Sequence, residues 1–228
     1  MPTARRAPDP PRRTGRPRTN TRPIVGDPSE EILAAAGRLF GELGVAGTSM
    51  SRLAAEVGLK QSSLYYYFNR KEEVVAALVA RANVIPLAHL RRVTDAGGPP
   101  AVQLYRFVLG DVQALCALPF DINEVHRIAA RDPEEFAGYW RERASLERQL
   151  ARIIEQGTAT GTFREVDPRF TALTLMANDE GVQNWYRLGS RRDPAAIGTA
   201  LADLCIGGLL VRSGGLERIQ RTALSDFP

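Results

Sequence analysis

A repeated Asp-Pro pair is the feature that most limits how this chain folds. From residue 27 onward the pair occurs four times, at 27–28, 132–133, 167–168 and 193–194. Aspartate accepts hydrogen bonds from the free amide groups that open a helix, and proline suits the first helical position because its fixed φ already fits. Each pair therefore predicts the start of an α-helix.

The segments between these pairs have helical spacing of apolar residues. Ile32, Leu39 and Leu43 fall on one face of a helix that begins at Pro28 and ends at Gly44. Further helices are expected over residues 71–95 with a kink at Pro86, and over 100–117, 123–130, 133–156, 168–188 and 194–213. No run of strands is indicated. We expect an all-α protein of about nine helices, with an N-terminal three-helix helix-turn-helix bundle and a larger helical body.

Residues 49–68 have the pattern of a helix-turn-helix. Ser49 suits the cap of one short helix, Gly58 suits a left-handed turn, and a second short helix follows from Gln61. If Leu64 and Phe68 form the buried edge of that second helix, Ser62 and Tyr66 point away from the core, because each residue turns the helix by about 100°.

Three consecutive tyrosines, residues 65–67, strengthen this interpretation. They span about 200° of a helix, so at least one must face solvent. A face of hydroxyl, amide and aromatic groups suits base edges and phosphates in a DNA major groove. Between residues 52 and 71, four basic residues accompany a single acid, Glu56. The alternative is a small helical bundle with solvated charges.

Three motifs carry a resemblance to a known family: Gly47-Thr48-Ser49-Met50-Ser51-Arg52-Leu53-Ala54, Val57-Gly58-Leu59 and Ser63-Leu64-Tyr65-Tyr66-Tyr67-Phe68-Asn69-Arg70-Lys71. This set is similar to the DNA-binding signature of the TetR family, the tetracycline-repressor-like regulators. The resemblance covers about residues 28–75. It implies a homodimeric, ligand-responsive transcription factor, usually a repressor, that binds a palindromic operator in double-stranded DNA.

The resemblance also implies roles for individual residues. Ser49, or Thr48 beside it, would bind a phosphate, and Tyr67 and Lys71 would contact the DNA backbone. Lys60 stands where the family commonly has serine, so the usual hydroxyl cap is replaced by a group that cannot accept a hydrogen bond but that suits a phosphate. The full DNA-contacting set expected in this domain is Thr48, Ser49, Arg52, Lys60, Gln61, Ser62, Ser63, Tyr65, Tyr66, Tyr67 and Lys71.

The first 22 residues form a basic arm. They carry seven arginines and one aspartate, so a net +6 here leaves −2 for the rest of a chain whose total is +4. Such an arm indicates a polyanionic partner, with nucleic acid first. Gly15-Arg16-Pro17-Arg18 resembles the core of an AT-hook, in which Arg16 and Arg18 would enter the minor groove. The alternative is an arm that only attracts phosphates.

We therefore expect three segments: a disordered basic arm over 1–27, a helix-turn-helix DNA-binding domain over 28–75, and a helical ligand-binding and dimerisation domain over 76–228. Two C-terminal helices combine apolar and small residues at helical spacing, and by position they correspond to the family's dimer helices. Monomer core is the alternative. The expected interface residues are Leu173, Ala177, Gly181, Leu188, Leu201, Leu204 and Gly208.

Between the arm and those helices lie aromatic, sulfur-containing and polar residues that would line a pocket for a small apolar effector. Each of them also suits plain core. Asp179 is the least expected, because it interrupts an apolar helix; it would anchor a ligand or partner helix, or form part of an exposed charge pair. The expected pocket residues are Tyr105, Cys116, His126, Phe136, Tyr139, Trp140, Met176 and Asp179.

Other classes of function have little support in the sequence. No motif for nucleophilic catalysis or nucleotide binding occurs, so an enzyme is not expected. Cys116 and Cys205 lie 89 positions apart and there are only two histidines, so no metal or cofactor is expected. No apolar run reaches the ~18 to 20 residues of a membrane helix, so we expect a cytoplasmic protein without a membrane partner. The remaining alternative is a helical adaptor or scaffold without sequence-specific DNA binding.

Overall fold

A computed structural model describes residues 27–118, 120–187 and 190–225. These residues form an all-α protein, which confirms the expected fold class, and an isolated bridge between Phe163 and Leu210 is its only β-type pairing within the described ranges. The α-helices are α1 Pro28–Gly47, α2 Met50–Glu56, α3 Gln61–Tyr67, α4 Lys71–Arg81, α5 Val84–Ala96, α6 Pro100–Ala117, α7 Ile122–Arg131, α8 Ala137–Ala159, α9 Pro168–Gly181, α10 Pro194–Leu209 and α11 Leu216–Leu224.

Three of the four Asp-Pro pairs open helices as expected. The carboxylates of Asp27, Asp167 and Asp193 accept hydrogen bonds from backbone amides in the first turns of α1, α9 and α10. Asp132 differs: its Oδ1 accepts from Glu135 N at 3.0 Å, but residues 133–136 form a turn and α8 begins at Ala137. The prediction of a helix start at residue 133 was therefore wrong, because the backbone leaves helical geometry at Phe136, where ψ is 26°.

The expected helix over 71–95 is two helices, α4 and α5, separated at Ala82 and Asn83. Pro86 accounts for the break, because a proline cannot donate to the carbonyl four residues earlier, here that of Ala82, and its ring clashes with it. Residues 71–96 together are apolar enough for a membrane span, but the run is divided at this break and 44% of its most apolar window is buried in the protein.

Near the C-terminus the helices are shorter than expected and one was missed. The expected helices over 168–188 and 194–213 end at Gly181 and Leu209, and α11 follows. Arg106 of α6 holds the end of α11 by donating to the carbonyls of Thr222 and Ala223 at 3.0 and 3.2 Å. The contacts that fix α11 lie over 100 residues away in sequence, where a search for local periodicity does not reach.

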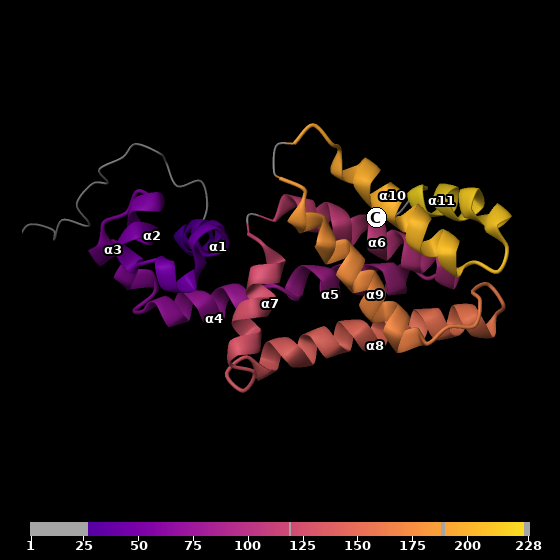
Figure 1. The fold of residues 1–228 in the computed structure, drawn as a ribbon, viewed down its shortest axis with the longest axis horizontal. Helices are drawn as coiled ribbons and strands as arrows, with labels where there is room; N and C mark the ends of the chain where they lie inside the picture. Colours follow the sequence, from indigo (N-terminus) through magenta and orange to yellow (C-terminus); the bar gives the residue numbers. More distant parts are fainter. Residues whose placement is uncertain (1–26, 119, 188–189, 226–228) are drawn as a thin grey trace, which may run out of the picture.

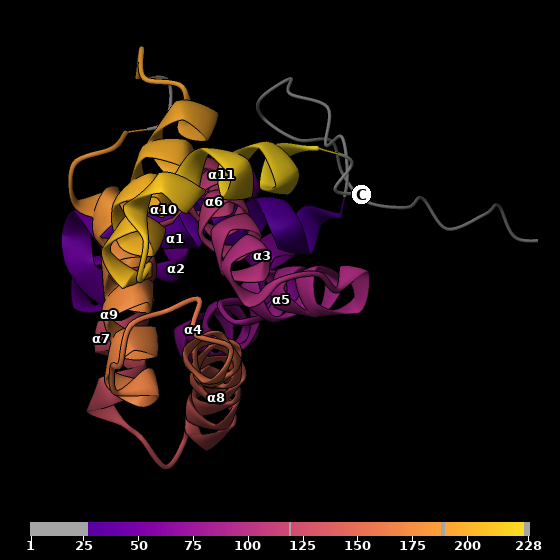
Figure 2. The same cartoon turned by 90° about the vertical axis from the view of Figure 1, so that its right-hand side faces the viewer.

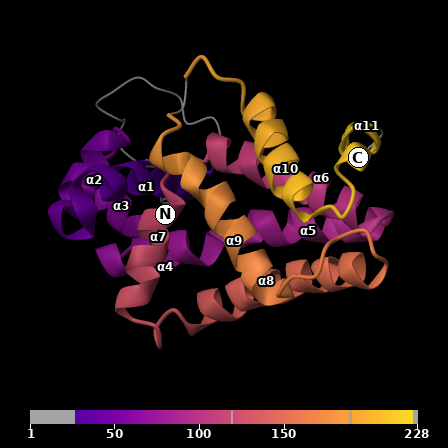
Figure 3. The ribbon, with the colours of Figure 1, turned by 45° about the vertical axis from the view of Figure 1, so that its right-hand side comes forward.

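The helices form a small N-terminal group and a larger body (Figure 1). Helices α1, α2 and α3 lie together at one end, and α4 leads from them to the body. In the body α6 is central and packs against α5, α8, α9, α10 and α11. The view along the molecule in Figure 2 shows α8 on one side of α6 and α10 with α11 on the other. Figure 3 shows α7 between the N-terminal group and α9.

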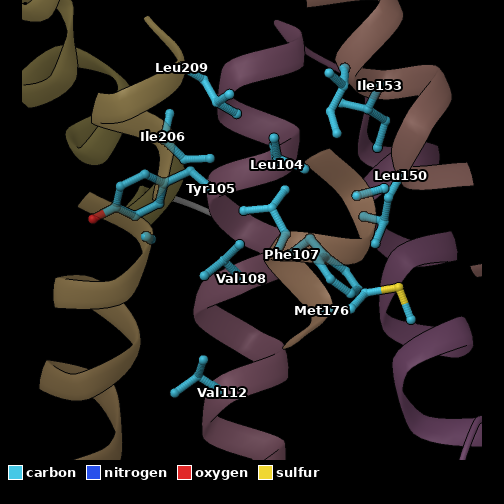
Figure 4. Close-up of a cluster of buried hydrophobic side chains, with 14 of the residues drawn as sticks. Leu104, Tyr105, Phe107, Val108, Val112, Leu150, Ile153, Met176, Ile206 and Leu209 are labelled. Atoms are coloured by element: carbon cyan, nitrogen blue, oxygen red, sulfur yellow. The ribbon is translucent and has the colours of Figure 1, made fainter. Parts of the chain in front are cut away.

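The body is held together by the apolar side chains of α6. In Figure 4, Phe107 points toward Leu150 and Met176, while Tyr105 and Val108 point toward Ile206. These side chains belong to one buried cluster that joins α6 to α8, α9 and α10. A second cluster joins α1–α4 to α7 and the start of α8, so the body's helices also support the N-terminal group.

Candidate nucleic-acid interface and effector cavity

The turn between α2 and α3 has the geometry expected from the sequence. Ser49 caps α2, since its Oγ accepts from Arg52 N at 3.2 Å. Gly58 has the left-handed φ of 65° that lets the chain turn between the two helices. Lys60 precedes α3 without a side-chain cap hydrogen bond, as expected from the missing hydroxyl.

One face of α3 is buried and the opposite face is open to solvent. Leu64 is fully buried and Phe68 is 9% exposed, whereas Tyr66 is 85% exposed. Gln61, Ser62 and Ser63 are also exposed, and Tyr65 is 42% exposed with its hydroxyl near Gln61. The expectation that Ser62 and Tyr66 point away from the core is therefore confirmed. That they contact bases stays a prediction.

The surroundings of this face are basic. Arg52 and Lys60 are exposed. Glu56, the acid on α2, lies 3.3 Å from Arg38, so its charge is paired. Positive charge beside an exposed polar helix face attracts the DNA backbone before any base is contacted.

Two residues expected to contact the DNA backbone have other partners. Thr48 is 1% exposed and its hydroxyl donates to the carbonyls of Gly44 and Leu39 at 3.0 and 3.3 Å, so a phosphate contact through this hydroxyl was a wrong prediction. Ser49, the alternative, is exposed. The Lys71 ammonium donates to the carbonyls of Val45 and Thr48 at 2.7 and 3.1 Å, which fixes the connection between α1 and α2. Arg16 and Arg18 lie outside the described residues.

A cavity of about 330 Å³ lies where the N-terminal group meets the body. Leu33 of α1 and Leu78 of α4 line it together with residues of α5 to α9. Met176 is the one residue of the expected pocket set that lines it. An occupant of this cavity would therefore contact both parts of the molecule.

The other expected pocket residues lie elsewhere, which corrects their assignment. Tyr105 is buried between α6 and α10, and its hydroxyl donates to Asp203 at 2.8 Å. Cys116 lines a separate hollow beside α1, and Phe136 and Trp140 pack against the N-terminal core. Sequence spacing identified them as apolar and inward-facing but did not show which helices meet around the cavity. His126, Tyr139 and Asp179 belong to a group of polar side chains near the cavity.

That polar group is centred on an ion pair between α8 and α9. Arg143 donates from both terminal nitrogens to the Glu180 carboxylate, at 2.7 and 2.9 Å. His126 Nε2 lies 3.2 Å from the same carboxylate, and the other ring nitrogen contacts the Tyr139 hydroxyl. Burial raises the pKa of Glu180, but hydrogen bonds from His126 and Arg143 outweigh it, so the pKa lies below its usual value.

Two further carboxyls lie close to this pair. Asp111 of α6 lines the cavity and is 8% exposed, and burial, followed by the charge of Glu180, raises its pKa to about 7. Asp179 is fully buried, and burial followed by the charge of Asp111 raises its pKa well above the usual value. Neither Asp179 oxygen has a hydrogen-bond partner among the residues described.

One signal in the sequence marks Asp111, and none marks Arg143. Asp111 is the single acid in the helix Pro100–Ala117, on a face of apolar residues, so it could have been selected as Asp179 was. Arg143 is one of many charged residues on α8, and nothing in its spacing identifies it as the partner of Glu180.

The outer face of α9 and α10 is apolar and open. Phe170, Leu173 and Leu204 are 69%, 48% and 70% exposed, and Ala177 and Gly208 are exposed beside them. Gly181 and Leu201 are half-buried, and Leu188 lies outside the described residues. Dimerisation through this face stays a prediction.

The geometry thus defines a helix-turn-helix protein with a helical body. Residues 32–78 match the family of bacterial regulatory proteins named tetR, and residues 103–209 match the tetracyclin repressor-like C-terminal domain. The chain belongs to the TetR family and is a DNA-binding transcriptional regulator.

Similar proteins agree with this assignment. The transcriptional repressor KstR2 of Mycobacterium tuberculosis strain H37Rv is 24% identical over 185 residues, which cover 78% of this chain and 91% of that protein. The structure of the M. tuberculosis ketosteroid transcriptional regulator KstR2 has a TM-score of 0.72 at 22% identity, covering 82% of this chain and 97% of that one.

Two further structures share the fold. The TetR-family regulator PfmR from Thermus thermophilus has a TM-score of 0.69 at 27% identity, over 78% of this chain and 98% of that one. AibR, solved in complex with isovaleryl coenzyme A and operator DNA, has a TM-score of 0.67 at 23% identity, over 80% of this chain and 97% of that one.

Proposed function

We propose that this chain is a cytoplasmic, ligand-responsive repressor that binds a palindromic operator as a homodimer. The observation that carries the proposal is the exposed polar face of α3 around Ser62 and Tyr66, with Tyr66 85% exposed. The relatives named as repressors, and the AibR complex with operator DNA, support the same conclusion.

In this proposal α3 enters the major groove. Gln61, Ser62, Ser63, Tyr65 and Tyr66 contact base edges, because hydroxyl and amide groups can donate to and accept from them and an aromatic ring can contact the thymine methyl. Phosphate contacts come from Ser49, Arg52, Lys60, Tyr67 and the remaining N–H of Lys71, and the basic arm adds to them.

The open apolar face of α9 and α10 serves as the dimer interface. A two-fold dimer would present its two α3 helices to half-sites about 34 Å apart or slightly more. Leu204→Arg should convert the dimer to a monomer in sedimentation experiments, because it places a charge on the most exposed leucine of this face. Val84→Arg, at another exposed apolar residue, is the matched control and should leave the dimer intact.

The cavity explains how an effector would control DNA binding. Its walls include α1 and α4, so a ligand contacts the elements that carry α2 and α3. A ligand that binds one arrangement of the two parts more tightly shifts the population toward it and changes the separation of the two α3 helices. AibR was solved with both isovaleryl coenzyme A and operator DNA, which supports control of DNA binding by an organic effector.

The proposal is tested by selecting bound fragments from random double-stranded DNA with the full chain. We expect a palindromic site, bound in a salt-sensitive manner and released by at least one small molecule that binds the cavity. Absence of any sequence-specific complex would contradict the proposal and favour a helical scaffold that does not recognise DNA.

A further inference from the structure

The charged side chains of the cavity wall come from five helices. Three of them, Asp111 of α6, Arg143 of α8 and Glu180 of α9, lie in a wall that is otherwise mostly apolar. The other two, Glu30 and Arg81, form an ion pair with each other. Arg143 and Glu180 are 20% and 14% exposed. The chemistry of an occupant depends on which of these groups still has a free bonding position.

Arg143 and Glu180 satisfy each other. Both terminal nitrogens of Arg143 donate to Glu180, one to each carboxylate oxygen, and His126 lies beside the same carboxylate. A bidentate pair of this kind neutralises both charges and leaves few hydrogen-bond donors or acceptors free for a ligand. Arg143 is therefore not a free anchor for a carboxylate or phosphate.

Asp111 has no such partner. Its side chain is more than nine-tenths buried and lines the cavity, and no hydrogen bond or ion pair joins it to another of the described residues. Behind it Asp179 is buried without a hydrogen-bond partner. Within the described part of the chain, Asp111 thus lies near one arginine whose charge is already matched by Glu180, and Asp179 lies near Asp111. A buried carboxylate without a cation is costly.

We propose that the effector carries a positively charged amine on an apolar body, and that the amine binds the Asp111 carboxylate inside this cavity. The inference rests on the proposed function, which makes the cavity the effector site. An ammonium group supplies both the missing charge and the missing donors, and Leu33, Leu78 and Met176 contact the hydrocarbon body.

Two other occupants fit less well. An anionic end would meet the carboxylates of Asp111 and Glu180, so like charges would oppose it. A metal ion lacks a ligand set, since the described residues contain no group of three His, Cys, Asp or Glu side chains placed to hold one.

The test uses three ligands that share one rigid hydrocarbon cage: 1-adamantanamine, 1-adamantanol and 1-adamantanecarboxylate, each titrated into the full chain by calorimetry at pH 8. The amine should bind at least tenfold more tightly than the alcohol, and the carboxylate should bind most weakly. Asp111→Asn should reduce amine affinity to that of the alcohol. Asp95→Asn, which removes the same charge from an exposed position on α5, should change nothing.

A second measurement needs no variant. Between pH 6 and pH 8 the amine stays charged while Asp111 loses its proton, so amine affinity should rise severalfold and alcohol affinity should stay constant. Equal affinities for amine and alcohol, binding of the amine unaffected by Asp111→Asn, or no binding by any of the three would overturn the proposal.

The operator complex separates this inference from the proposed function. If the amine binds through Asp111 but leaves operator affinity unchanged, the cavity chemistry stands and the effector role of the cavity fails. If isovaleryl coenzyme A releases the operator while the amine does not bind, the regulatory function stands and the amine proposal is wrong.

Discussion

The α3 face presents its polar groups to solvent, whereas the cavity wall holds its polar groups in the interior of the protein. On α3 the hydroxyls point outward and Tyr66 is 85% exposed, whereas in the body Asp111 is 8% exposed and Asp179 fully buried. Leu64 and Phe68 anchor α3 in the N-terminal core, while the buried carboxyls interact with groups from other helices. Recognition of a duplex needs accessible groups, and recognition of a small molecule needs groups removed from water.

The largest expected effect comes from breaking the buried ion pair. Arg143→Ala leaves Glu180 beside Asp111 and Asp179 without its cation, and removal of one partner of a buried pair typically costs about 3–5 kcal/mol. Urea unfolding of the full chain should show a loss of this size. Arg141→Ala, an exposed arginine on the same helix, should change the free energy of unfolding by less than about 0.5 kcal/mol. Equal losses of unfolding free energy in the two variants would show that the Arg143–Glu180 pair stabilises the protein no more than an exposed arginine does.

The next effect is a pH dependence centred on Asp111. Its pKa is raised from 3.8 to about 7 in the folded protein, so the folded state holds the proton more tightly and stability falls as pH rises through this range. Asp111→Asn should match the parent chain near pH 4 and exceed it by on the order of 1–3 kcal/mol at pH 8.

The groups near Asp111 set the size of that effect. Glu180 and Asp179 of α9 oppose its charge and Arg143 of α8 favours it. His126 of α7 lies beside the same ion pair, Tyr139 of α8 contacts His126, and Cys205 of α10 lies near Asp179. If the two chains have parallel stability curves from pH 4 to pH 8, then Asp111 does not titrate in the folded protein as described.

The helix-turn-helix was predictable because its signals are local. Ser49, Gly58 and Leu64 lie within 16 residues, and a cap, a left-handed turn and a buried edge each follow from one residue type at one position. The cavity was not predictable in this way, because its wall joins Leu33 to Glu180 across most of the chain. Helical periodicity shows that Asp111 faces inward, but it does not show that Arg143 forms an ion pair with Glu180.

Deletion of residues 1–22 should produce a smaller change, confined to DNA binding. The arm carries seven arginines, so its removal should make the salt dependence of operator binding less steep by about 0.9 for each phosphate that the arm contacts. Fluorescence anisotropy at several salt concentrations measures this slope. An unchanged slope would exclude both minor-groove insertion and simple phosphate attraction by the arm.

The smallest expected effects distinguish two neighbouring hydroxyls. Thr48→Val removes the buried donor to Gly44 and Leu39 and should lower the free energy of unfolding by about 1 kcal/mol, with little direct effect on DNA contacts. Ser49→Ala removes an exposed cap, so it should weaken both α2 and operator binding. If Thr48→Val weakened operator binding without lowering stability, Thr48 would have to contact a DNA phosphate directly.

The most direct test of the account compares the affinity of Tyr66→Ala for the selected operator and for unrelated DNA. Because Tyr66 lies on the open face of α3, its loss should weaken operator binding by about 1–3 kcal/mol, leave binding to unrelated DNA nearly unchanged and preserve the unfolding transition. An operator affinity equal to that of the parent chain would contradict the assignment of this face to base recognition.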